Sequence, residues 1–418
     1  MPEQELIPRL FRTEFTKITS VLCKYLGTDN IGIAEDIASE TFMAALETWP
    51  YRGVPENPVA WLYTVAKNKT KNYINRTHLF NEAIAPVLAK SDPEEVLPEV
   101  DLSGKNISDS QLQMLFAICH PSISVESQIG LSLRILCGLG IDEIANALLT
   151  NKETVNKRLQ RAKEKLRTEK IRIELPSEKD ISSRLETVLT TLYLLFNEGY
   201  YSESRDSVVR EDLCLEAMRL TYLLVGNEQT NKPEVNALLS LMCFHSSRFN
   251  ARKMNNGEII LYSEQDESLW NQELITRGAY FLRQASTGED ISKYHLEAGI
   301  AFWHTIKKDS KEKWESILQL YNELLIKEYS PVAALNRTYA LSMVHGKEAA
   351  IEAAEKLNLE RNHFYFTLLG ELYKDIDKQK ALLNYQKALS LAKTQTDKQL
   401  LKRKIDLIDK LTGGQNPG

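Results

Sequence analysis

Apolar residues recur at intervals of three and four along most of this chain of 418 residues, which is the spacing of one face of an α-helix. From residue 181 to residue 412 this spacing is almost continuous, and no strong strand pattern interrupts it. A chain of this length is too long for one core and suits two or three domains. The pattern therefore predicts an all-α protein with several helical domains.

A helix-turn-helix is predicted between residues 141 and 172. The first helix ends near Leu148, and Thr150 or Asn151 can cap the second helix by accepting a backbone N–H. The second helix has one apolar stripe, formed by Val155, Leu159, Ala162 and Leu166. Its other faces carry nine Lys and Arg residues against three Glu residues. A solvated hairpin would show a similar stripe, but the capped turn and the concentrated positive charge favour a recognition helix that lies in the major groove of DNA.

Residues 1 to 80 form another helical module, with helices predicted at 6–26, 34–49 and 59–76. The helix 34–49 carries only acidic charges, whereas the helix 59–76 carries four basic residues and no acidic one. Trp61, Tyr63 and Tyr73 are interleaved with those basic residues. Aromatic rings stack on unpaired bases while lysines follow phosphates, so the module is predicted to bind single-stranded nucleic acid. Trp61 and Tyr73 could instead be core residues.

A linker is predicted at residues 82–105, where three prolines and several acidic residues break the helical spacing. Two further helices, at 109–119 and 124–137, are expected to pack beneath the helix-turn-helix. Pro121 separates these two helices and ends the first of them.

The C-terminal part repeats at an offset of 34 residues, which is the period of tetratricopeptide repeats. The residues Leu335, Asn336, Tyr339, Ile351, Ala354 and Leu357 recur as Leu369, Gly370, Tyr373, Tyr385, Ala388 and Leu391. These are packing positions of paired helices, so the repeat predicts a stacked scaffold instead of a reactive site.

Composition adds few chemical candidates. The formal net charge is −5, and the five cysteines are scattered without a CxxC pair, which argues against structural zinc. A cluster of Glu198, His245, Glu264 and Asp266 could be imagined as an acid–base or metal site, but helix ends and caps explain it better because no paired His spacing accompanies it. No cofactor or metal is expected, and the chain is predicted not to be an enzyme. Neither a signal peptide nor an apolar run of about 18 residues is present, which predicts a cytoplasmic protein.

The order of the N-terminal segments resembles a known family. LFRTEF, then AEDIASETFMAALETWP, then NPVAWLYTVAKNKTKNYINR is similar to the second conserved region of extracytoplasmic-function (ECF) sigma factors. The helix-turn-helix followed by VNKRLQRAKEKLR resembles their fourth region. LYLLFNEGYY and LYSEQDESLWNQELI look like segments of the subgroup that carries a long tetratricopeptide-like extension.

The resemblance implies two small helical sigma modules joined by a linker and followed by a tetratricopeptide-like domain. The ranges expected for them are region 2 at 1–80, the linker at 81–106, region 4 at 107–175 and the C-terminal domain at 176–418. It also implies binding residues. Those expected to bind core RNA polymerase are Asp36, Glu40 and Phe42. Those expected to bind promoter DNA are Trp61, Asn68, Lys71, Asn72 and Arg76 at the minus-ten element, and Lys152, Glu153, Asn156, Lys157 and Arg161 at the minus-thirty-five element.

An alternative sigma factor is therefore the expected function, with the C-terminal domain docking on the sigma modules and modulating them. The competing interpretation is a one-component regulator, in which the C-terminal domain senses a ligand or protein and the helix-turn-helix binds an operator. That interpretation leaves the first 80 residues without a role.

Overall fold

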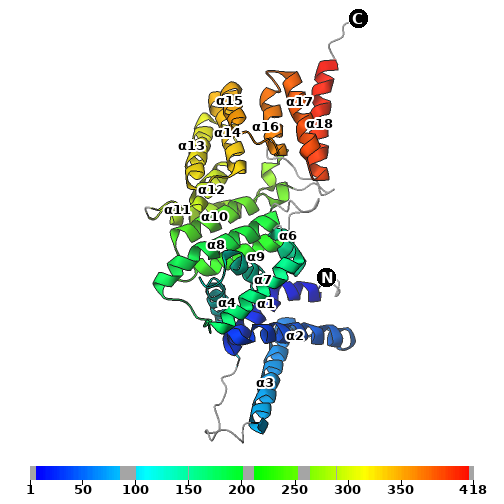
Figure 1. Ribbon diagram of the computed structural model, residues 1–418, viewed down its shortest axis with the longest axis vertical. Coiled ribbons are helices and arrows are strands. Elements are labelled where there is room, and N and C mark those ends of the chain that lie inside the picture. The colour runs from blue at the N-terminus through cyan, green and yellow to red at the C-terminus, as the bar shows by residue number, and fades with distance from the viewer. Residues whose placement is uncertain are drawn as a thin grey trace. The chain divides into compact units, whose positions relative to one another are not determined.

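The computed structural model describes residues 6–84, 100–148, 150–200, 211–252, 264–288 and 290–413. These residues form α-helices and short 3-10 turns and contain no strand, which confirms the predicted all-α class. They form two compact units (Figure 1). The first comprises residues 1–195 with 226–230, and the second comprises residues 196–225 with 231–418.

The first unit begins with three long helices, α1 (Leu6–Leu26), α2 (Ile31–Arg52) and α3 (Pro58–Ile84). All three lie where the apolar spacing predicts them, but α2 and α3 are longer than expected. Helix α2 continues past Pro50 and ends where Gly53, at φ 79°, donates its N–H to the carbonyl of Trp49. Glycine adopts this left-handed backbone without steric penalty, so Gly53 ends the helix instead of Pro50.

Five helices complete the first unit, namely α4 (Gly104–Ile118), α5 (Val125–Ile135), α6 (Ile141–Ala147), α7 (Lys152–Thr168) and the first part of α8 (Glu178–Tyr200). Helix α4 starts five residues before the predicted Asp109, because Ser103 caps it by accepting from the backbone N–H of Asn106. Most of the predicted linker, residues 85–99, lies outside the described residues.

The second unit continues α8 and then contains ten helices in the described ranges, α9 (Glu211–Val225), α10 (Pro233–Ser246), α11 (Gln272–Ala285), α12 (Lys293–Trp303), α13 (Lys311–Lys327), α14 (Pro331–His345), α15 (Lys347–Leu357), α16 (His363–Tyr373), α17 (Lys378–Leu391) and α18 (Gln395–Gly413). Helices that follow one another in sequence pack side by side, as α16, α17 and α18 do in orange and red (Figure 1). None of the described helices has the length and apolarity to span a bilayer.

The 34-residue repeat corresponds to two pairs of helices. The offset places α14 on α16 and α15 on α17, and one apolar core joins all four helices. Leu335 and its equivalent Leu369 are both buried in that core, as are Ala354 and its equivalent Ala388. The repeated positions are therefore packing positions, as the sequence predicts.

Gly370 allows α16 and α17 to approach closely, and its replacement is expected to destabilise the second unit. A Cβ at Gly370 would lie 2.6 Å from Cε1 of Tyr385, whose side chain is fully buried. We expect Gly370→Ala to lower the free energy of unfolding by about 1–3 kcal/mol through overpacking, despite the better helix propensity of alanine. Urea unfolding would measure the change. Gly104→Ala is the control, since its Cβ would meet no atom within 4 Å, and a Gly370 variant as stable as wild type would contradict the prediction.

The second unit is also expected to lose stability in mild acid because of His304. Burial, together with the cations of Arg248 and Lys313, lowers the pKa of His304 to about 4. The unfolded chain binds a proton at this histidine near pH 6.5, whereas the folded chain does so only near pH 4, so stability is complete above 6.5 and falls as the pH drops through this window. The loss attributable to His304 is about 3 kcal/mol. Urea titrations at several pH values should show a smaller change of stability with pH for His304→Gln than for wild type, and an equal change would contradict the prediction.

Candidate nucleic-acid interface

Helix α3 is held on α1 by a partly buried polar contact. The hydroxyl of Tyr63 donates to Oε2 of Glu14 at 2.6 Å, and Nζ of Lys17 lies 2.8 Å from the other carboxylate oxygen. Burial and this hydrogen bond raise the pKa of Tyr63, so its hydroxyl stays protonated and keeps donating. Tyr63 therefore positions α3 on α1. This role differs from the stacking on a base that the interleaved aromatic pattern suggests.

One face of α3 presents amides and basic groups to solvent. Asn68, Lys71, Asn72 and Arg76 are exposed, at helical spacing that places them together. Lys69 lies outside this group, and its Nζ forms an ion pair with Oε2 of Glu40 on α2 at 2.9 Å. Trp61 is half-buried and packs edge-on against Trp49, with ring centroids 5.4 Å apart. The predicted minus-ten residues thus share one surface, except that Trp61 is partly a packing residue.

Helix α2 presents an acidic and apolar face. Asp36 and Glu40 are exposed, whereas Phe42 is buried between Phe11 and Phe15 of α1. The exposed apolar side chains on this helix, which the sequence analysis did not single out, are Met43, Leu46 and Tyr51. The signal for them was present, because positions 38, 42, 45 and 49 form the buried stripe and leave Met43 and Leu46 outside it.

Helices α6 and α7 form the predicted pair around a short turn. Oδ1 of Asn151 accepts from the N–H of Thr154 at 2.8 Å, which is the expected cap. The described buried residues of α7 are Val155, Leu159, Ala162 and Leu166, which confirms the predicted stripe. Nζ of Lys152 lies 2.5 Å from Oδ1 of Asp142 and ties the start of α7 to α6.

The exposed side of α7 is predominantly cationic. The residues predicted to contact the minus-thirty-five element, Lys152, Glu153, Asn156, Lys157 and Arg161, all lie on this exposed side. Lys157 forms an ion pair with Glu153 one turn earlier, at 2.6 Å. A DNA phosphate or base edge would have to compete with this weak, solvent-exposed pair.

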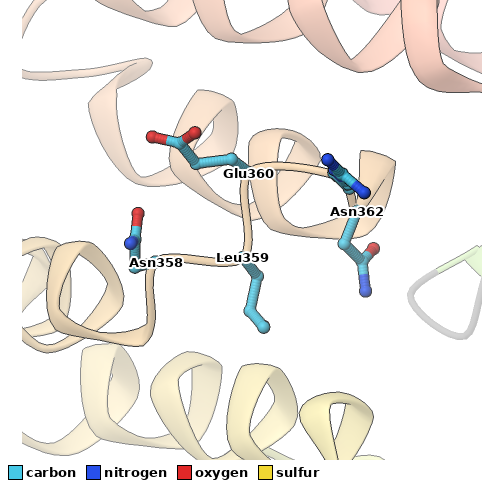
Figure 2. Close-up of a pocket in the computed structure, with 5 residues that line it drawn as sticks. Asn358, Leu359, Glu360 and Asn362 are labelled. Carbon is cyan, nitrogen blue, oxygen red and sulfur yellow. The ribbon is translucent and has the colours of Figure 1, made fainter.

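The remaining titratable residues do not form a reactive site within the described ranges. Asp266 caps a 3-10 turn by accepting from the N–H of Ser268. His245 is half-buried, and desolvation together with nearby Arg248 and Arg252 lowers its pKa. Among the described residues no group of three metal-ligating side chains exists. The consecutive residues 358–362, at the turn between α15 and α16, form an open pocket. In Figure 2 the side chains of Asn358 and Leu359 point in opposite directions. Its lining offers neither a nucleophile nor a metal site.

Comparison with known proteins identifies the N-terminal helices. Residues 10–79, which cover most of α1 and all of α2 and most of α3, match the family Sigma-70 region 2. Residues 184–286 match a family of unknown function, DUF6596. The chain is 32% identical to "Uncharacterized protein R00370" of Rhizobium meliloti (strain 1021) over 390 residues, which is 90% of each chain. No solved structure matched the chain.

The chain therefore belongs to one family with the Rhizobium protein, and its residues 10–79 are similar to Sigma-70 region 2. Its region 2 is followed by a helical C-terminal region, part of which matches the family of unknown function.

Proposed function

We propose that the chain is an ECF-type sigma factor that binds core RNA polymerase and directs it to promoters. The observation that carries the proposal is the Sigma-70 region 2 match over α1–α3, whose helices present an acidic face on α2 and a basic, amide-rich face on α3. A sigma-70 factor acts by binding, so no catalytic group is assigned to it.

Polymerase binding is assigned to the exposed face of α2. Asp36 and Glu40 supply negative charge, and the neighbouring Met43 and Leu46 supply apolar area for an interface core. Phe42 contributes indirectly, because its buried ring packs α2 on α1. The exposed face of α3 is assigned to the minus-ten element and the exposed face of α7, at the end of region 4, to the minus-thirty-five element. In this assignment region 2 spans 1–80, the linker 81–106 and region 4 107–175.

The experiment that tests the proposal is reconstituted transcription. Purified full-length chain is mixed with core polymerase and a genomic fragment library, and transcript starts are mapped. We expect stable co-purification with core polymerase and a shared pair of sequence elements upstream of the starts. A one-component regulator would instead bind operator DNA alone and give no new starts with core polymerase, and that result would refute the proposal.

The C-terminal domain, residues 176–418, is further proposed to be a tetratricopeptide-like scaffold that docks on the sigma modules and modulates them. Its paired helices at the 34-residue offset support the scaffold. Deleting it after Thr168 would be a poor test, because Ile181 and Leu185 of α8 are buried and Arg184 donates to the carbonyl of Phe116 in the first unit.

A full-length variant is a better test of modulation. Gly370→Val should disturb the packing of α16 on α17 while leaving region 2 and region 4 folded. Transcription at the wild-type rate by this variant, with circular dichroism confirming partial loss of helix, would refute a modulating role. Leu383→Ala, at an exposed position of α17, is the matched control.

A further inference from the structure

The ends of α8 and α10 meet two 3-10 turns in the second unit. These turns are η4 (Phe249–Ala251), directly after α10, and η6 (Glu267–Leu269), before α11, and they contact each other. The guanidinium of Arg252, the residue after η4, lies 3.9 Å from the ring centroid of Tyr200 at the end of α8. Both turns, Arg252 and Tyr200 lie within residues 184–286, which match the family of unknown function. This part of the chain therefore places an arginine against an aromatic ring.

Two arginines lie deep in this group. Arg248 and Arg252 are each only 8% exposed, which is unusual for a side chain that carries a charge. Nη2 of Arg248 lies 3.3 Å from Nδ1 of His245, and the ring centroid of His245 lies 4.7 Å from that of Tyr200. A guanidinium stays charged in a protein, and burying its charge is favourable only when an anion lies close to it. The arrangement therefore favours negative charge beside the two arginines.

Two lysines that follow α12 add positive charge to the group. Nζ of Lys307 donates to the carbonyl of Gln265, two residues before η6. Lys313 is fully buried, and its Nζ lies 2.7 Å from the carbonyl oxygen of Ile306 and 3.1 Å from Oδ1 of Asp309. The side chain of Asp309 is 58% exposed, so this carboxylate lies at the solvent edge of the group and pairs with the lysine there.

Two histidines experience the positive potential of this group. Burial, followed by the cation of Arg248, lowers the pKa of His245 well below its usual value. Burial and the same arginine lower the pKa of His304 to about 4, although Asp309 acts in the opposite direction. Both imidazoles are therefore neutral at pH 7 and add no charge to that of the arginines. An oxyanion beside Arg248 would be stabilised by the same potential that disfavours a proton on either ring.

We propose that Arg248, Arg252, His245 and Tyr200 form a binding site for a small oxyanion, namely the carboxylate or phosphate group of a soluble ligand. A guanidinium offers a planar fork of N–H donors, which matches either group through two parallel hydrogen bonds. The ring of Tyr200 lies against Arg252 and holds its guanidinium in place through a cation–π contact.

The charges around His245 decide between an anion and a metal ion. The sequence pattern allows this histidine in a metal site, but Arg248 and Arg252 lie close enough to lower its pKa, and cations at that distance repel a metal ion. The site lies wholly in the second unit. The inference therefore goes beyond the proposed function and does not depend on it.

The site can be tested by titrating the full-length chain with small anions. Isothermal titration calorimetry is carried out with inorganic phosphate and, separately, with acetate, each against sodium chloride at the same ionic strength. We expect one saturable site per chain, with a Kd of about 1 mM or lower for at least one of the two anions. Binding of phosphate alone identifies a phosphate-bearing ligand, binding of acetate alone identifies a carboxylate, and binding of both identifies a site that accepts either group.

Single variants of the two arginines show where the anion binds. Arg248→Gln and Arg252→Gln each remove one charged donor and should weaken binding by about tenfold or more. Arg252→Lys keeps the buried charge but loses the fork of donors, so it should also weaken binding, and it serves if a glutamine variant does not fold. Arg277→Gln is the matched control, because Arg277 is exposed on α11 and pairs with Glu273. Lys157→Gln is the control for anions at the proposed DNA-binding surface. Both controls should bind as wild type does, and circular dichroism verifies that every variant is folded.

Three results would overturn the proposal. The first is that neither anion binds wild type more tightly than chloride does. The second is that the folded arginine variants bind with wild-type affinity, and the third is that Lys157→Gln abolishes binding, since in both cases the anion lies elsewhere. Transcription is a separate measurement. A chain that binds the anion at this site but does not transcribe with core polymerase would refute the proposed function and leave the anion site standing.

Discussion

Alanine at both Lys157 and Arg161 is expected to abolish most of the preference of the polymerase complex for a matched minus-thirty-five element. Both side chains project from the exposed face of α7, four residues apart and opposite the buried Val155 and Leu159. A side chain bonded to a base edge contributes about 1–3 kcal/mol of discrimination, whereas a phosphate contact weakens all sequences alike. We expect at least one of the two residues to contact a base.

The measurement compares the double variant and each single alanine variant with wild type on matched and mutated elements at one salt concentration. A base contact lowers affinity for the matched element and leaves that for the mutated element nearly unchanged. Lys165→Ala is a suitable control near the end of α7, where only a phosphate contact is expected. If both single variants lose affinity equally on both elements, then Lys157 and Arg161 bind phosphate alone and the assignment of base reading to them is wrong.

Asp36→Arg is expected to lower the affinity for core polymerase by about 2–5 kcal/mol, the range observed when a charge at a desolvated interface loses its partner or meets its own sign. Asp36 is exposed, and its carboxylate forms no ion pair with the described part of the chain. Reversing its charge therefore removes nothing from the fold, and the effect should appear in binding rather than in stability.

Titration of core polymerase with labelled chain would measure this affinity. Glu360→Arg changes the net charge of the chain by the same amount at an exposed loop of the second unit and should bind as wild type does. If the Asp36 variant binds with wild-type affinity, the acidic face of α2 is not part of the interface, and Met43 and Leu46 are the residues to test next.

Local features of the fold could be predicted from the sequence because they depend on neighbouring residues. The stripe from Val155 to Leu166 and the cap at Asn151 are set by helical periodicity and by one side-chain hydrogen bond, and both are confirmed. The helix predicted at 34–49 ends too early, because α2 continues through Pro50 to Arg52 and is closed by Gly53.

Features that join distant parts of the chain could not be predicted in this way. Glu35 and Lys163 are 128 residues apart, and nothing in either local pattern indicates that they meet. Tyr63 was interpreted as a base-stacking residue because it lies among lysines, yet its hydroxyl bonds to Glu14 on another helix. The proposed binding residues remain predictions, since exposure on a shared face is necessary for binding but does not demonstrate it.

The close approach at Gly370 has a consequence for how this family varies. Gly278 on α11 repeats the arrangement, since its Cβ would lie 2.6 Å from Cε1 of Phe244, just as that of Gly370 would from Tyr385. At each site the glycine and the ring fill the available space, so a larger side chain in place of the glycine would clash with the ring. A relative that has replaced the glycine should therefore carry a smaller side chain in place of the ring, so that the two positions are inherited as a matched pair.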